Sequence, residues 1–299
     1  MAKSANGSAP VRIALVQMRM KEDPTANLAL AQERIEEAAK RGAQIVCLPE
    51  LYRSLYFPQA EDAENFRLAE PVPGPTSKAM SALAKKHRLV IVAPIFEKRG
   101  TGVYHNSALV FDADGSLAGH YRKMHIPDDP EFYEKFYFAP GDLGFPTFKT
   151  RYGTLGILIC WDQWFPEAAR LASLAGAQIL LYPTAIGHHV HVEKTLWTEQ
   201  HAAWETIQRG HAVANGVFVA AVNRVGTEGK LRFWGQSFVS SPFGALRAKA
   251  DLDAEEVLIA DLDLSEIERI RHGWPFLRDR RIDAYAHLTA RLIDETAKR

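Results

Sequence analysis

A short apolar stretch that ends in a cysteine sets the strongest constraint on how this chain can fold. The run Leu155–Ile159 is typical of a strand that is buried on both faces of a sheet. Cys160 follows it, and Pro166 suits the first turn of a helix, where its missing N–H is not needed. The pattern predicts a strand, a sharp turn at Cys160 and a helix over 166–175. Open α/β folds carry reactive groups at such turns, and a buried structural thiol is the alternative.

The beginning of the chain repeats this alternation of strand and helix. A strand is expected over 11–18, and Asp23 followed by Pro24 has the composition of a helix start. The helical spacing of apolar residues ends at Gly42, and a second buried strand follows over 44–48. This β-α-β order predicts an α/β fold with a parallel component in its sheet.

Similar patterns define a single domain over residues 11–272. Further strands are expected over 89–96, 103–111, 116–121, 153–160, 178–182, 217–222, 235–240 and 256–263. Further helices are expected over 76–87, 198–214 and 264–272. The small and polar residues 1–10 predict a flexible N-terminal tail. Residues 273–299 are rich in arginine and aromatics, and predict an extension that packs on the domain or on a neighbouring subunit.

The charge balance gives no support for nucleic acid or an anionic membrane as a partner. The chain has 299 residues, and its 36 Lys and Arg equal its 36 Asp and Glu. No signal peptide and no apolar run long enough to span a bilayer is found, so a cytoplasmic location is expected. Cys47 and Cys160 are the two cysteines, and no disulfide is expected between them in a reducing compartment.

Polar residues at the ends of apolar strands are the candidates for a functional site. Glu50 directly follows a buried strand, and a charge in such a place needs a partner. Lys123 also follows a strand. A solvated loop acid and a solvated surface lysine are the alternative interpretations of these two residues. Glu134 has aromatic residues on both sides, and it is expected to hold Lys123 in place unless the two form only a weak surface pair.

Glu50, Lys123 and Cys160 together offer a base, a fixed positive charge and a nucleophile. Strands packed side by side can bring their ends into one cleft despite a long sequence separation. A lysine near the cysteine would stabilise an oxyanion and lower the pKa of the thiol. No histidine stands in a comparable position, which weighs against a Cys–His protease. The trio therefore predicts nucleophilic catalysis by a thiol.

The segments around these three residues resemble the signature blocks of the nitrilase, or carbon–nitrogen hydrolase, superfamily. The blocks are LPELY around Glu50, GHYRKMHIP around Lys123 and ILICWDQWFPEAAR around Cys160, in the order of the family. The resemblance extends over about residues 11–263. It implies an α/β fold in the form of a four-layer α-β-β-α sandwich. It also implies a homo-oligomer built on a two-fold dimer, through the helix that follows the nucleophile.

The resemblance further implies a role for each residue. Cys160 would be the nucleophile, Glu50 the general base and Lys123 the oxyanion stabiliser. The backbone N–H of Trp161 would be the second oxyanion donor, and Glu134 would support Lys123. No metal and no organic cofactor are expected, because the thiol and two charged groups cover every proton and charge step. The expected partner is a small-molecule ureido or amide substrate.

Further blocks resemble one branch of the superfamily, the N-carbamoylputrescine amidohydrolases. These blocks are CWDQWFPE, EKFYFAPGD, YPTAIG and AVNRVG. They imply hydrolysis of N-carbamoylputrescine to putrescine, CO₂ and ammonia, a step of polyamine biosynthesis. Other carbamoyl-amine and carbamoyl-amino-acid amidohydrolases and ω-amidases are the alternatives. Substrate contacts are expected from Trp161, from Tyr56 in an aromatic loop, and from Thr184 at the end of a strand.

One loop departs from the pattern of this branch. Plant members follow YPTAIG with Ser-Glu-Pro, whereas this chain continues with His188, His189 and Val190. The missing acid is one that would meet the distal ammonium of the substrate. Glu193, Glu199 and Asp162 are the acids that could bind the ammonium in its place.

Two other classes of function compete with catalysis. The first is a metal site formed by His188, His189, His191 and Glu193. The second is a non-catalytic nitrilase-fold protein that binds a partner, and the presence of the complete trio argues against it.

Overall fold

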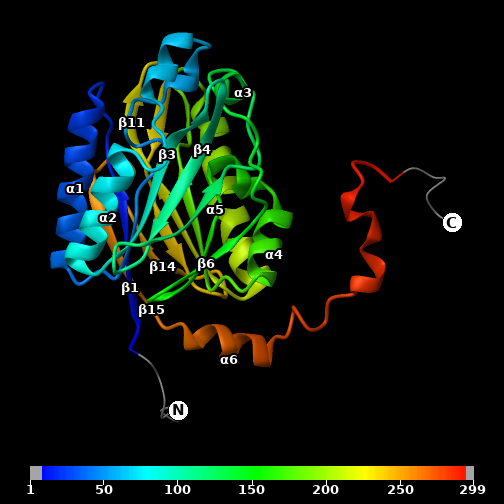
Figure 1. The fold of residues 1–299 in the computed structure, drawn as a ribbon. Helices are drawn as coiled ribbons and strands as arrows, with labels where there is room; N and C mark the ends of the chain where they lie inside the picture. Colours follow the sequence, from blue (N-terminus) through cyan, green and yellow to red (C-terminus); the bar gives the residue numbers. More distant parts are fainter. Residues whose placement is uncertain (1–8, 294–299) are drawn as a thin grey trace.

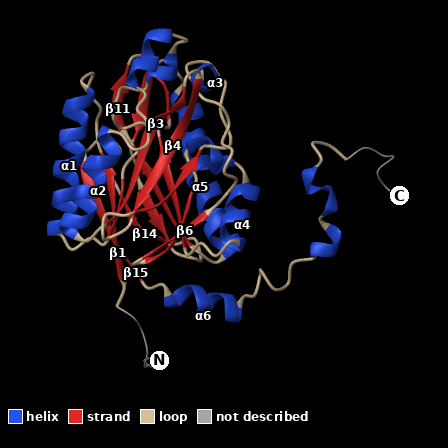
Figure 2. Cartoon of the chain, viewed as in Figure 1, coloured by secondary structure: helices blue, strands red, loops and turns tan. Residues whose placement is uncertain are grey.

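Two six-stranded sheets, packed face to face, form the centre of the computed structural model, which describes residues 9–293. Helices α1 (Pro24–Lys40) and α2 (Pro75–His87) cover one outer face, and α4 (Pro166–Leu174) and α5 (Lys194–Asn215) cover the other (Figure 1). Figure 2 shows the strands as the inner layers between these helices. The expected four-layer α-β-β-α sandwich is confirmed.

Each large sheet mixes parallel and antiparallel pairs. The first sheet has the order β15 (Glu256–Leu262), β1 (Val11–Gln17), β2 (Ile45–Cys47), β3 (Val90–Gly100), β4 (Val103–Phe111) and β5 (Leu117–Arg122). The second has the order β14 (Leu246–Lys249), β13 (Phe238–Ser240), β10 (Phe218–Asn223), β8 (Ile179–Thr184), β7 (Gly153–Ile157) and β6 (Thr147–Thr150). A small third sheet contains β11 (Val225–Glu228), β12 (Leu231–Trp234) and β9 (Gly187–His189).

Alternation along β1 explains the stacking of the layers. Ile13 and Leu15 belong to the core between the two sheets. Ala14 and Val16 point the other way and pack in a cluster that includes residues of α1 and α2. Successive strand residues face opposite sides of a sheet, so a strand that is apolar at every position must be covered on both faces.

The first and last strands of the first sheet are neighbours. β1 pairs in parallel with β2, and Ile13 lies opposite Ile45. On its other side β1 pairs antiparallel with β15, and Val11 lies opposite Leu262. The sheet is therefore completed by a strand from the far end of the domain.

Most element boundaries follow the sequence signals, with a few differences. Asp23 caps α1 by accepting a hydrogen bond from Thr25 N–H at 2.8 Å, as its place before Pro24 predicts. The strand expected over 153–160 ends at Ile157, and a 3₁₀ turn, η3 (Cys160–Trp164), precedes α4. The helix expected over 198–214 begins earlier, at Lys194. The small sheet of β9, β11 and β12 was not expected.

The C-terminal segment follows α6 (Ser265–Gly273) and lies on the side of the molecule that carries α4 and α5 (Figure 1). It contains two short 3₁₀ turns, η4 (Ile282–Ala284) and η5 (Ala286–Thr289). Of the expected N-terminal tail, residues 1–8 lie outside the described residues, as do residues 294–299 of the C-terminal extension. Among residues 9–293, no helix has the length and apolar character needed to cross a membrane.

Candidate active site

The two large sheets bring their polar strand ends together at one end of the sandwich. Glu50 and Lys123 follow β2 and β5 of the first sheet, and Cys160 follows β7 of the second. Glu50 and Lys123 are fully buried, and Cys160 is 6% exposed. The three predicted residues, which are far apart in the sequence, share one buried environment between the sheets.

One ammonium group lies between two carboxylates in this environment. Lys123 Nζ donates to Glu50 Oε1 at 2.8 Å and to Glu134 Oε2 at 2.7 Å. Asn106 Nδ2 also donates to Glu50 Oε1, at 2.7 Å, and the Tyr56 hydroxyl donates to Glu134 Oε1 at 2.7 Å. Glu50 Oε2 is buried and has no hydrogen-bond partner within the described part of the chain. Glu50 is thus held by one oxygen, and its other oxygen is available for proton transfer.

The charges of this cluster act on one another. Burial alone lowers the pKa of Lys123, but the carboxylates of Glu134 and Glu50 outweigh burial and raise this pKa above 10.5. Burial raises the pKa of Glu134, although Lys123 opposes the shift. Burial and the Glu50 carboxylate raise the pKa of the Cys160 thiol well above 9.0, again against the effect of Lys123. Lys123 therefore lowers the pKa of the thiol, as expected, but desolvation is the larger effect and the net pKa is raised. The resting thiol is therefore protonated at neutral pH.

The backbone at Cys160 is held in an unusual conformation. Cys160 has a φ of +44°, in the left-handed region that non-glycine residues rarely adopt. The buried carboxylate of Asp162 fixes this turn, because its Oδ2 accepts from Ile159 N–H at 2.8 Å and from the Tyr121 hydroxyl at 2.7 Å. Its Oδ1 accepts from His125 N–H at 3.0 Å. Asp162 therefore positions the turn that carries the thiol.

A buried arginine holds the loop that follows Glu50. Arg224 Nη2 donates to the carbonyl oxygens of Glu50 at 2.7 Å and Leu51 at 3.0 Å. Its Nη1 pairs with Glu228 at 2.9 Å, and the same carboxylate accepts from Tyr56 N–H. The charge of Arg224 is thus balanced without solvent, and the base-bearing loop is tied to β11 of the small sheet.

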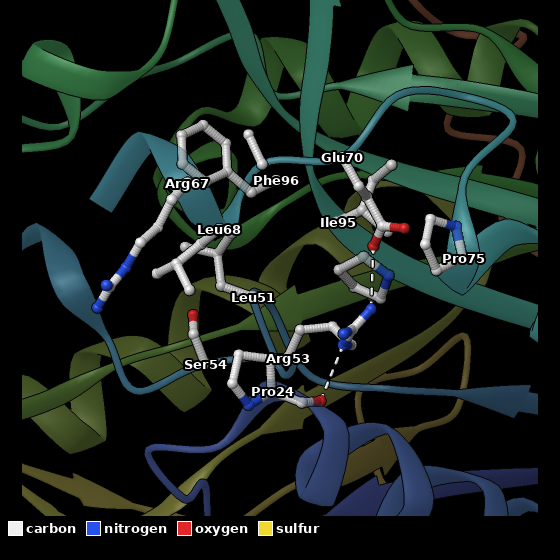
Figure 3. Close-up of a pocket in the computed structure, with 12 residues that line it drawn as sticks. Pro24, Leu51, Arg53, Ser54, Arg67, Leu68, Glu70, Pro75, Ile95 and Phe96 are labelled. Atoms are coloured by element: carbon white, nitrogen blue, oxygen red, sulfur yellow. Dashed lines mark hydrogen bonds and ion pairs between the residues drawn. The ribbon is translucent and has the colours of Figure 1, made fainter. Parts of the chain in front are cut away.

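Arg53 fixes the same loop from its outer side (Figure 3). Arg53 Nε donates to Pro24 O at 3.1 Å, and its Nη1 donates to Glu70 at 3.3 Å and to the Thr76 hydroxyl at 2.5 Å. Arg53, Pro24 and Glu70 line a small cavity of about 240 Å³, which Figure 3 shows together with Arg67 and Phe96. Arg53 and Arg224 therefore hold the Glu50 loop on both of its sides.

The strand end at Lys123 is also fixed by close backbone packing. Lys123 N–H donates to Asn106 O at 2.8 Å, and Lys123 O accepts from Gly141 N–H at 2.8 Å. A Cβ at residue 141 would lie 2.2 Å from Arg122 O, so only glycine fits at this approach.

A larger cavity of about 510 Å³ opens onto Cys160. Its wall is mostly apolar and aromatic, as is usual for a pocket that binds a small molecule. The lining residues are Pro127, Asp129, Pro130, Phe132, Glu134, Cys160, Trp161, Trp164, Ala185, Ile186, Gly187, Gln200, Ala203 and Trp234.

The structure separates the predicted substrate contacts. Trp161 lines the cavity. Tyr56 and Thr184 are buried beside the site and are not among the lining residues. The Tyr56 hydroxyl donates to Glu134, and the Thr184 hydroxyl donates to Tyr182 O at 3.0 Å. The three acids considered as partners of a substrate ammonium, Asp162, Glu193 and Glu199, do not line the cavity either.

Two functional candidates were missed from the sequence. Asn106 contacts both Glu50 and Glu134, but in the sequence it is one of three consecutive polar residues in β4, with His105 and Ser107, and nothing there sets it apart. Asp129 lines the cavity, but in the sequence it is one of several acids in a loop. Neither position can be assigned without the neighbouring strands.

The histidine loop does not assemble a set of metal ligands. His188 is in β9 and its ring stacks on Trp197 with centroids 5.0 Å apart, whereas the ring of His189 lies against His191. Among residues 9–293, no group of three or more His, Cys, Asp or Glu side chains could hold a metal ion. Cys47 is fully buried in the core and, like Cys160, is a free thiol.

Known proteins resemble this chain in sequence and in fold. The family model described as carbon-nitrogen hydrolase matches residues 12–272. An N-carbamoylputrescine amidase of Oryza sativa subsp. japonica is 43% identical over 95% of this chain and 96% of its own length. A citrullinase of Francisella tularensis subsp. tularensis is 40% identical over 93% of this chain and 97% of its own length. The crystal structure of a carbon-nitrogen hydrolase from Helicobacter pylori G27 has a TM-score of 0.92 and 47% identity, covering 95% of this chain and 99% of that one.

Proposed function

This chain belongs to the carbon–nitrogen hydrolase family, and from that premise we propose that it hydrolyses N-carbamoylputrescine to putrescine, CO₂ and ammonia. It is an enzyme of the amidohydrolase type. The substrate assignment rests on the relatives named N-carbamoylputrescine amidase, which align with nearly the whole chain. The observation that supports the chemistry best is the Glu50 carboxylate, which Lys123 and Asn106 hold by one oxygen and whose other oxygen has no hydrogen-bond partner among residues 9–293.

The first half of the reaction forms a bond between the enzyme and the substrate. Glu50 Oε2 accepts the proton of the Cys160 thiol, which is protonated in the resting enzyme, and the sulfur attacks the ureido carbon. The carbonyl oxygen gains the negative charge of the tetrahedral intermediate. Lys123 Nζ and the Trp161 N–H stabilise this oxyanion. Collapse of the intermediate breaks one C–N bond, and Glu50 returns its proton to the leaving nitrogen.

The second half restores the thiol. The cysteine now carries a carbamoyl group as a thioester-type intermediate. Glu50 takes a proton from a water molecule, whose oxygen attacks the carbamoyl carbon. The C–S bond breaks and the sulfur regains a proton, while the released carbamate decomposes to CO₂ and an amine or ammonia. Glu134 takes no part in proton transfer, and its role is to hold the Lys123 ammonium toward the reacting oxygen.

The proposed function includes the assembly and location of the enzyme. We propose a cytoplasmic homo-oligomer whose dimer contact lies on α4, the helix that follows the nucleophile. Leu171 and Leu174 on this helix are 48% and 46% exposed, which gives it an apolar outer face.

Ammonia release from a panel of substrates tests the proposal. The panel contains N-carbamoylputrescine, citrulline, N-carbamoyl-β-alanine, an N-carbamoyl-D-amino acid and an ω-amide, with Cys160→Ala as the matched blank. We expect the highest kcat/KM for N-carbamoylputrescine and no turnover by the folded variant. Higher activity on citrulline or on a carboxylate substrate would overturn the substrate assignment. Equal activity of the variant would overturn the role of Cys160.

A further inference from the structure

The cavity in front of Cys160 carries one charged side chain that the proposed mechanism does not use. Two carboxylates line this cavity, and one of them, Glu134, shares the Lys123 ammonium with Glu50. The other is Asp129, whose side chain makes no hydrogen bond or ion pair with any part of residues 9–293. No Lys, Arg or His is among the residues that line the cavity. The lining therefore has an unbalanced negative charge.

The remaining wall suits an alkyl chain that ends in a cation. Phe132, Trp161, Trp164 and Trp234 supply aromatic surface, which packs against methylene groups and attracts alkylammonium groups. A substrate with a distal carboxylate would meet Asp129 without any compensating positive charge. The negative charge of the wall thus favours a substrate with a distal ammonium over one with a distal carboxylate.

The segment that carries Asp129 is held in place by several contacts. Phe132 N–H donates to Asp129 O at 2.8 Å, which closes a tight turn, and Tyr133 N–H donates to Pro58 O at 2.9 Å. Glu131 within this turn pairs with Lys230 of the small sheet at 3.2 Å. These contacts fix the backbone at Asp129, whose side chain is exposed, so little backbone freedom is lost when this segment binds a ligand.

We infer that Asp129 is a specificity-determining residue, which binds the positively charged distal end of the substrate and makes this site select ureido compounds with a distal ammonium. The inference rests on the proposed function for the identity of the reacting group. Asp129 would thus bind the distal ammonium of the substrate, since the loop at His188 and His189 has no acid to do so. A solvated loop acid without a role in binding is the alternative.

The test compares N-carbamoylputrescine with n-butylurea, a neutral analogue that has the same four-carbon chain but no distal ammonium group. We expect Asp129→Asn to lower kcat/KM for N-carbamoylputrescine roughly tenfold or more, mainly through KM, because one charge-assisted contact is lost. We expect no change for n-butylurea. Asp128→Asn is the matched control, since Asp128 is an exposed neighbour that does not line the cavity, and it should affect neither substrate. Equal effects of Asp129→Asn on both substrates, or no effect, would overturn the inference.

Binding measured without turnover separates this inference from the proposed function. Calorimetry on the Cys160→Ala variant should show tighter binding of N-carbamoylputrescine than of n-butylurea. Adding Asp129→Asn should remove the difference. Charge-selective binding without hydrolysis by the intact enzyme would reject the proposed function and keep the role of Asp129. Hydrolysis by the intact enzyme, together with binding that Asp129→Asn leaves unchanged, would keep the proposed function and reject the role of Asp129.

Discussion

At the scale of single residues, the cysteine combines a strained backbone with a protonated thiol. Because burial raises the pKa of Cys160 above 9.0, thiolate is absent from the resting enzyme near neutral pH and forms only as the pH rises. We expect the difference in ultraviolet absorbance between the wild type and Cys160→Ala, followed as the pH is raised, to show no thiolate step below pH 9.0. A step near neutral pH would mean that Lys123 dominates over burial.

Lys123 has both a structural and a catalytic role, and the two can be separated. Lys123→Ala leaves two buried carboxylates unpaired, so we expect a loss of about 3–5 kcal/mol in the free energy of unfolding. We also expect kcat to fall by about 10² or more, because an oxyanion donor is lost. Adding Glu134→Gln should restore much of the stability but not kcat. Lys135→Ala, an exposed neighbour, is the control and should change neither quantity.

The contacts around the trio could not be predicted from the sequence. Glu50, Lys123 and Cys160 were found because each breaks an apolar pattern at the end of a strand. Asn106 breaks such a pattern inside a strand, where a buried amide is equally consistent with structural hydrogen bonding. Asp162 was considered as a substrate contact, but it is buried with its oxygens occupied. Its role depends on Tyr121 and therefore on the pairing of the two sheets.

At the scale of elements, an ion pair connects three strands of the first sheet next to Lys123. Glu97 of β3 is 3% exposed and binds Arg122 of β5 through two contacts of 2.6 Å and 2.8 Å. The Ser107 hydroxyl of β4, which lies between them, donates to the same carboxylate at 2.6 Å. Although burial opposes the effect, these donors lower the pKa of Glu97 below 4.5.

This network predicts a pH-dependent contribution to stability. Glu97→Gln should reduce the free energy of unfolding by about 2–4 kcal/mol at neutral pH, because Arg122 loses its buried counter-charge. Since the folded-state pKa of Glu97 is lowered, its stabilisation is present above pH 4.5 and is lost as the pH falls through the folded-state value. Urea unfolding at neutral and acidic pH should show the difference from the wild type shrinking in acid. Glu36→Gln, at a surface pair with Lys86, should leave the free energy of unfolding nearly unchanged at either pH.

Helices and strands with a long apolar pattern were predicted from the sequence, whereas short strands with polar residues were not. The helices α1 and α2 and the hairpin of β4 and β5 follow directly from spacing and turn residues. The strands β9, β11 and β12 contain His188, Thr227 and Arg232 among their few residues, so no alternation marks them as strands. They are recognised only from their pairing: Gly187 of β9 lies opposite Phe233 of β12, and Val225 of β11 lies opposite Trp234 of β12.

At the scale of the whole molecule, the C-terminal segment has a large apolar surface. Trp274, Ile282, Leu288 and Leu292 are 58%, 74%, 63% and 83% exposed. We expect deletion of residues 274–299 to leave the unfolding transition of the domain unchanged and to reduce its association. Light scattering after size exclusion measures the second effect, with urea unfolding as the control. An unchanged mass would contradict a role of this segment in assembly.

The pairing of β1 with β15 has a consequence for the synthesis of this protein. Residues 11 and 262 are opposite one another, so β1 leaves the ribosome well before its second neighbour in the sheet, β15, has been synthesised. During that time β1 has an unpaired edge, which is a template for pairing with other chains. A nascent chain arrested before residue 256 already contains the base, the lysine and the cysteine, yet its first sheet is incomplete. Such a chain should need chaperone protection and have no activity until residues 256–262 have joined the sheet.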